Sequence, residues 1–272
     1  LLLIFLIFYL IKITFLIFYN WYESNFLYSY KENLSSKLFK EYLNQNFNFF
    51  YNRNSSEFIR NLITEADQFV VYLVSILKLT LEIIIAIGIF CFLAYVDAYF
   101  AFFISIILIF FFSLYFFLFK DRLYNWGLQR QSNLQKLIQF MQEGFDGIKI
   151  IKLLGRENFF FNKFKVHNFN LSKISTKTYF FQGVPKLLFE LVGIFFITFS
   201  LFFLYYSGKT LIEITQILSI YVAASFRILP SVNKMATSLQ LLKLNSSAIN
   251  VLYKELKSFK KETQTSYEKF SF

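Results

Sequence analysis

The chain has 272 residues, of which 56% are hydrophobic and 22% aromatic, and it carries a formal net charge of +11 at pH 7. A soluble domain contains about 45–50% apolar residues, so this composition indicates an integral membrane protein. The chain has one cysteine and one histidine, which excludes an internal disulfide and argues against a metal site built from these residue types. We therefore predict neither a catalytic residue nor a metal ligand in this chain.

Five apolar runs are long enough to cross a bilayer, which needs about 20 residues per helix. They are too long for strands, so we predict an all-α fold, a polytopic membrane helical bundle. In chain order the spans cover about residues 1–19, 69–95, 99–119, 184–206 and 214–229. The last span is short and continues into an amphipathic helix that we expect to end near residue 256.

The basic residues indicate how the spans are oriented. The segments 20–68, 120–182 and 233–272 hold five, eleven and seven Lys and Arg residues, whereas the segments 96–98 and 207–213 hold none and one. Because loops rich in Lys and Arg stay in the cytosol, we expect the three long segments and the C-terminus to be cytosolic. This placement accounts for the positive charge, and we expect no nucleic-acid partner.

The first two long segments, 20–68 and 120–182, contain little Pro or Gly and much helical periodicity. Loops of this length without structure are uncommon. We therefore predict helical hairpins that extend the spans into the cytosol, with arms of about 25 residues that reach about 40 Å. The chain would turn around YNRNSSEFIRN (51–61) and EGFDGIKIIK (143–152).

The second turn is amphipathic. It places Phe145, Ile148, Ile151 and Leu154 on one side of a helix. The other side carries charges from Asp146 to Arg156. This pattern is also typical of a helix that lies on a membrane surface, and that alternative remains open.

Three segments carry a resemblance to a known family. FFYNRNSSEFIRNLITEADQF (49–69) resembles the first intracellular loop of six-helix ABC exporters, and QEGFDGIKIIKLLGREN (142–158) resembles the second. AASFRILPSVNKMATSLQ (223–240) is similar to the last span of lipid-linked oligosaccharide flippases and related exporters. The resemblance covers nearly the whole chain and implies the transmembrane-domain fold of an ABC exporter.

The family pattern is six spans followed by a nucleotide-binding domain. We find five spans and no G-x-x-x-x-G-K-[ST] motif, so we expect the first span and the ATPase domain to lie outside this sequence. Residues 1–256 would be the transmembrane domain, and 257–272 a linker toward the ATPase domain. The resemblance implies ATP and Mg in that domain, fused or separate, and a homodimer in a bacterial inner membrane, in contact with membrane lipid.

The resemblance also implies that the two turns are coupling helices that dock into ATPase domains. The first would comprise Asn54, Ser55, Ser56, Glu57 and Arg60. The second would comprise Glu143, Gly144, Phe145, Asp146, Gly147, Ile148 and Lys149. In this second segment Phe145 and Ile148 would form the centre of the contact.

Charged residues inside spans are costly and often functional. Lys78 and Glu82 are four residues apart, as are Lys186 and Glu190. Each pair either forms a salt bridge along its own helix or lines an inward-open cavity.

Two further cations lie in spans. Arg227 lies just before Pro230 and has no acidic residue within four positions. We expect it to bind an anionic group of the cargo, such as a pyrophosphate, or to pair with Glu82 or Glu190. Lys12 lies in the first span and either snorkels or lines the same cavity.

The leading hypothesis is a membrane subunit or fragment of an ATP-driven exporter or flippase that moves a lipid-linked or amphipathic cargo by alternating access. The alternative is a non-transporting scaffold or a degenerate fragment without an ATPase motor. A membrane-embedded enzyme would need convergent acid, base or metal-binding groups, which the spans lack. An ion-coupled carrier usually has short loops on both sides and broken helices, which this sequence does not show.

Overall fold

The computed structural model describes residues 2–51, 53–96, 98–206 and 211–268, and within these ranges every regular element is helical. Among the described residues, four helices are long and apolar enough to cross a membrane: Leu3–Leu43, Ser55–Val96, Ala101–Asp146 and Glu157–Phe199. This confirms the predicted all-α membrane fold. The fifth predicted span, 214–229, lies in helix α8, but three of its side chains fall outside the described set.

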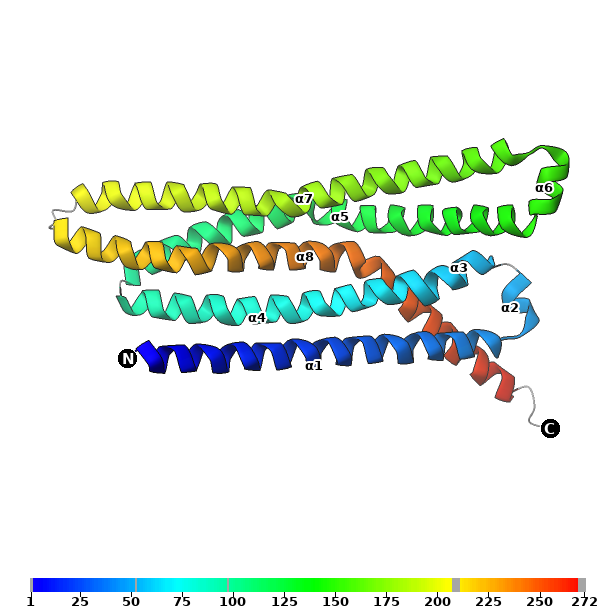
Figure 1. The fold of residues 1–272 in the computed structure, drawn as a ribbon, viewed down its shortest axis with the longest axis horizontal. Helices are drawn as coiled ribbons and strands as arrows, with labels where there is room; N and C mark the ends of the chain where they lie inside the picture. The colour runs from blue at the N-terminus through cyan, green and yellow to red at the C-terminus, as the bar shows by residue number, and fades with distance from the viewer. Residues whose placement is uncertain (1, 52, 97, 207–210, 269–272) are drawn as a thin grey trace. The chain divides into compact units, whose positions relative to one another are not determined.

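The chain forms two compact units, residues 1–74 with 248–272 and residues 75–247. The first unit contains α1 (Leu2–Leu43), α2 (Phe47–Tyr51), α3 (Ser55–Arg60), the π-helix η1 (Asn61–Glu65), the start of α4 (Ala66–Val96) and the end of α8 (Leu211–Glu268). Figure 1 labels the α-helices.

Aromatic and aliphatic side chains hold the first unit together. Leu38 and Tyr42 of α1 are buried against Leu252 and Phe259 of α8. The Tyr42 ring lies 4.7 Å from the Phe58 ring and 5.3 Å from the Phe259 ring. Fully burying one such side chain is worth about 1.5–3 kcal/mol, so this cluster fixes the end of α1 to α3 and α8.

The second unit contains α5 (Ala98–Asp146), α6 (Ile148–Leu154) and α7 (Glu157–Tyr206), with the remaining parts of α4 and α8. Helices α5 and α7 run side by side, and α6 joins them at one end (Figure 1). Both long helices continue well beyond the apolar runs at 99–119 and 184–206.

Helices α5 and α8 make one very close approach within this unit. A Cβ atom at Gly127 would lie 2.2 Å from the backbone oxygen of Leu244. Three residues further along α5, Arg130 Nη1 donates a hydrogen bond to Asn245 Oδ1 at 3.1 Å. Glycine is therefore required at 127, because any side chain would push the two backbones apart.

Gly155 ends α6 with a left-handed conformation, φ 62°. An Ala side chain in this conformation costs about 1 kcal/mol, so Gly155→Ala should destabilise the α6 turn by about that amount. Faster hydrogen exchange of the α6 amides would report the loss. Gly88→Ala is the control, because a Cβ there meets nothing within 4 Å. Equal exchange rates in the two variants would contradict the prediction.

Candidate functional site

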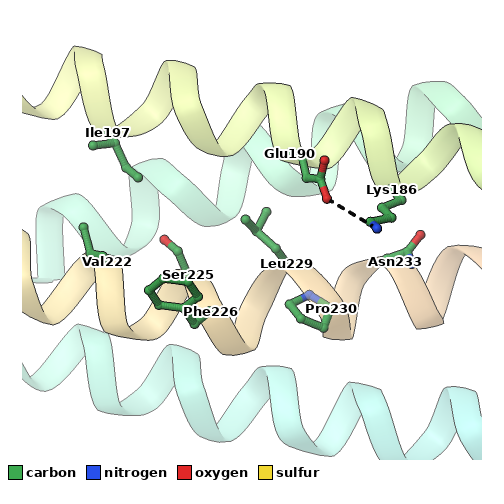
Figure 2. A pocket seen from close by; sticks show the side chains of 9 residues that line it. All are labelled: Lys186, Glu190, Ile197, Val222, Ser225, Phe226, Leu229, Pro230 and Asn233. Atoms are coloured by element: carbon green, nitrogen blue, oxygen red, sulfur yellow. Dashed lines mark ion pairs between the residues drawn. The ribbon is translucent and has the colours of Figure 1, made fainter.

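A cavity of about 410 Å³ lies between α7 and α8 in the second unit. Figure 2 shows its lining residues: Lys186, Glu190, Ile197, Val222, Ser225, Phe226, Leu229, Pro230 and Asn233. The charged and amide side chains gather at one end, and Ile197 and Val222 lie at the other (Figure 2). The cavity therefore has a polar end and an apolar end.

Lys186 and Glu190 form the charged part of this cavity. They lie one turn apart on α7, with Lys186 Nζ 3.9 Å from Glu190 Oε1, and their side chains are 65% and 51% exposed. A separation of 3.9 Å is too long for a hydrogen bond. The pair is thus loosely held, and both groups are accessible to a ligand.

Pro230 modifies the α8 wall of the cavity. It lies inside α8 and has no amide hydrogen, so it cannot donate the usual helical hydrogen bond to the carbonyl of Phe226. The Phe226 side chain is largely exposed. On this wall the Ser225 hydroxyl already donates to the Tyr221 carbonyl at 2.8 Å.

Glu82 has a different environment, and the expected ion pair with Lys78 does not form. Glu82 is only 6% exposed and accepts a hydrogen bond from Ser231 Oγ at 2.6 Å. Lys234 Nζ lies 3.1 Å from its other oxygen, whereas Lys78 is exposed. A lysine on α8 thus balances Glu82, and the i,i+4 spacing within α4 did not reveal this partner.

Arg227 is exposed and does not line the cavity. It forms no ion pair with an acidic residue within the described ranges. Of the two expected partners, Glu82 pairs with Lys234, and Glu190 lies in the loose pair with Lys186. Contact between Arg227 and an anionic cargo stays a prediction. Lys12 is also exposed, with its Nζ 5.3 Å from the centre of the Tyr9 ring.

The residues expected for the first coupling helix form α3 and its N-cap. Asn54 caps this helix by accepting from the Ser56 amide at 3.0 Å, and Ser55 is its first residue. Ser56 and Arg60 are buried, with Arg60 Nη2 donating to Asn61 Oδ1 at 2.9 Å. Ser56 and Arg60 therefore face the interior of the turn, whereas Asn54 and Ser55 are exposed.

Two aromatic side chains of the short helix α2 are highly exposed at this turn. Phe47 and Tyr51 are 81% and 79% exposed, and the sequence interpretation did not include them among the contact residues. The available signal was the aromatic run FNFFY at 47–51. Large exposed aromatic side chains are typical of a contact surface.

Arg53 and Glu57, also at this turn, form an ionic cluster with α8. Arg53 Nη1 donates to Glu255 Oε2 at 3.0 Å, Nη2 binds Glu255 Oε1, and Glu57 lies 3.4 Å away. The guanidinium lies 4.7 Å from the centre of the Phe49 ring. Burial acts to lower the pKa of Arg53, but the hydrogen bonds and charge of Glu255 outweigh it and hold this pKa above its ordinary value.

The second turn consists of Gly147, α6 and Gly155. Gly147 interrupts the helix between Asp146 and Ile148, with φ −91° and ψ 11°. Glu143 and Gly147 line a shallow groove of about 430 Å³ beside α6. Lys152 Nζ pairs with Glu157 Oε1 at 3.0 Å across the turn.

The apolar side chains exposed at this turn differ from the set that the sequence predicted. Ile151 is buried, whereas Phe145, Ile150 and Leu153 are exposed, Leu153 by 85%. The helical periodicity does not continue from Phe145 to Leu154 because α6 is a separate helix after Gly147. Gly144, Asp146, Ile148 and Lys149 lie at this break; of these, Asp146, Ile148 and Lys149 are exposed.

The apolar helices continue as long arms, and the short helix α6 joins two of these arms. This architecture defines a polytopic helical membrane protein with extended helical hairpins. The model of the family described as "ABC transporter transmembrane region" matches residues 1–229. The chain therefore belongs to this family and is an integral membrane protein. Domains of this family generally act together with ATPase domains.

Proposed function

We propose that the chain is the membrane subunit, or part of it, of an ABC exporter or flippase that moves a lipid-linked or amphipathic cargo by alternating access. The observation that carries this proposal is α6, a short helix with exposed apolar side chains that joins α5 and α7. Family membership supports an ATPase partner that drives transport, because ABC transmembrane domains generally pair with ATPase domains. A scaffold without a motor is the alternative.

In this proposal α6 and α2 are the docking segments for the ATPase domains. Leu153 and Phe145 at the second turn, and Phe47 and Tyr51 at the first, offer apolar side chains that a groove can bury. Buried apolar anchors of this kind usually carry most of the energy of an interface. Movement of the ATPase domains would then be transmitted along α5 and α7.

ATP and Mg belong to the ATPase domain in this proposal. The sequence contains no G-x-x-x-x-G-K-[ST] motif, so the residues of this chain do not fit a nucleotide site of that type. A homodimer in a bacterial inner membrane, with the arms and the C-terminus in the cytosol, completes the proposal. The orientation is supported by the distribution of Lys and Arg residues.

The cavity between α7 and α8 is the candidate cargo site. It has accessible charges at one end and apolar walls elsewhere. Ligand sites are generally concave and mostly apolar, with a few polar groups that orient the ligand. An amphipathic cargo fits this arrangement.

Leu153→Asp tests the coupling role. A buried, unpaired carboxylate is strongly unfavourable in an apolar interface, so ATP-driven movement of cargo and its stimulation of ATP hydrolysis should both be lost. The measurement uses the protein with its ATPase domain in proteoliposomes. Phe169→Asp is the matched control, because Phe169 is also exposed and lies on α7, about 18 Å along the helix from Glu157.

The control should retain the wild-type rates. If Leu153→Asp retains them too, α6 does not couple the two domains. If the wild-type protein with its ATPase domain moves no cargo at all, the scaffold alternative is favoured.

A further inference from the structure

The polar and apolar ends of the α7–α8 cavity are ordered along the helix axis. Lys186 and Ile197 are eleven residues apart on α7, which corresponds to about 16 Å of helix. That length is about half of the hydrocarbon core, which is about 30 Å thick. With the predicted orientation, the charged end lies near the cytosolic interface and the apolar end near the middle of the membrane.

The charges of the cavity restrict the ligand. Lys186 and Glu190 contribute one positive and one negative group, both exposed and too far apart to satisfy each other by a hydrogen bond. An anion bound at Lys186 would leave Glu190 unbalanced, and a cation bound at Glu190 would leave Lys186 unbalanced. An unbalanced charge is costly where it borders the hydrocarbon core, so a ligand group that carries both signs fits best.

The α8 wall adds groups that suit the positive part of such a ligand. The carbonyl of Phe226 lacks the usual helical hydrogen bond from residue 230, because that residue is proline. The exposed Phe226 ring offers a face for a cation–π contact. Glu190 and Phe226 can therefore bind an ammonium, while Lys186 binds a phosphate or carboxylate.

The second charged cluster of this unit contrasts with the cavity. Glu82 is buried and already contacted by Ser231 and Lys234, so it has little capacity left for a ligand. The Lys186–Glu190 pair is open. This difference identifies the α7–α8 cavity, and not the Glu82 cluster, as the binding site.

We propose that this cavity binds an amphiphile with a zwitterionic polar group and a hydrocarbon chain. The polar group binds Lys186 and Glu190, and the chain extends toward Ile197. The assignment of this ligand as cargo rests on the proposed function, whereas the binding itself does not. The site takes a net-neutral headgroup, in contrast to the anionic group that Arg227 was expected to bind.

The test compares three probes with the same dodecyl chain: dodecylphosphocholine, dodecyl phosphate and dodecyltrimethylammonium. Equilibrium binding is measured on the full protein with its ATPase domain, in a neutral maltoside detergent, with empty micelles as the reference. Wild type should bind the zwitterionic probe about tenfold more tightly than either charged probe, which corresponds to one strong charge-assisted contact.

The single-charge variants should change the preference. Glu190→Gln should weaken binding of the zwitterionic probe about tenfold and should shift the binding preference to dodecyl phosphate. Lys186→Gln should shift the binding preference to dodecyltrimethylammonium. The exchange of both charges, Lys186→Glu with Glu190→Lys, should restore the zwitterionic preference. Lys173→Gln, at an exposed position of α7 outside the cavity, should behave as wild type.

Equal binding of the three probes by wild type would overturn the proposal, as would unchanged preferences in both single variants. In either case Lys186 and Glu190 are an interfacial surface pair. The outcome is independent of transport. Selective binding without ATP-driven movement of cargo would support the zwitterion site and contradict the transporter function. ATP-driven movement of cargo without selective binding would support the transporter function and contradict the zwitterion site.

Discussion

Replacing Glu255 by Ala should lower the free energy of unfolding by about 3 kcal/mol, as expected when a buried ion pair loses one partner. The Glu255 side chain is 4% exposed and binds both terminal nitrogens of Arg53. Its loss leaves the guanidinium without its main acceptor. We place the value at the lower end of the range for buried pairs because Arg53 retains some contact with solvent.

Thermal or denaturant unfolding in detergent measures this effect, and hydrogen exchange of α2 shows whether the loss is local. Glu57→Ala is the matched control, because Glu57 also contacts Arg53 but is more exposed. Its loss should cost less than about 1 kcal/mol, as for exposed ion pairs. Equal losses in the two variants would show that burial of Glu255 does not matter.

This ion pair shows why part of the structure could not be predicted from sequence. Arg53 and Glu255 are separated by 202 positions, and nothing near either residue indicates the other. The same holds for Glu82 and Lys234, where the local spacing favoured Lys78 instead. Side-chain pairs between distant helices depend on the packing angle of those helices, which hydropathy does not contain.

The helices themselves could be predicted, because apolar runs longer than a strand can only be helical in lipid. The predicted turn at 143–152 contains the break, because Gly147 separates α5 from α6. The apolar face predicted from helical periodicity does not continue across this break, because α6 is a separate helix that begins at Ile148 and buries Ile151. The capping role of Asn54 also went unrecognised, because the family resemblance suggested a docking role for that segment.

Pro185 gives the second unit an unusual contact between three helices. Proline lacks the amide that would pair with the carbonyl four residues earlier, that of Phe181. Two neighbouring helices supply side-chain donors to this carbonyl instead. Tyr115 Oη of α5 and Gln240 Nε2 of α8 both donate to the Phe181 oxygen at 3.1 Å, and Gln240 Nε2 also lies 2.6 Å from Tyr115 Oη.

Gln240→Leu should therefore destabilise the protein by about 2 kcal/mol, because it removes two buried hydrogen bonds, one to the Phe181 carbonyl and one to Tyr115 Oη. In the Pro185→Ala background the same substitution should cost less, since the amide at position 185 then pairs with the Phe181 carbonyl inside α7. A double-mutant cycle from thermal unfolding should give a coupling of at least about 0.5 kcal/mol between the two positions. Additive effects would mean that Gln240 does not compensate for the missing amide. Tyr115→Phe checks the result independently, because it removes the other donor to the same carbonyl and should show the same dependence on Pro185.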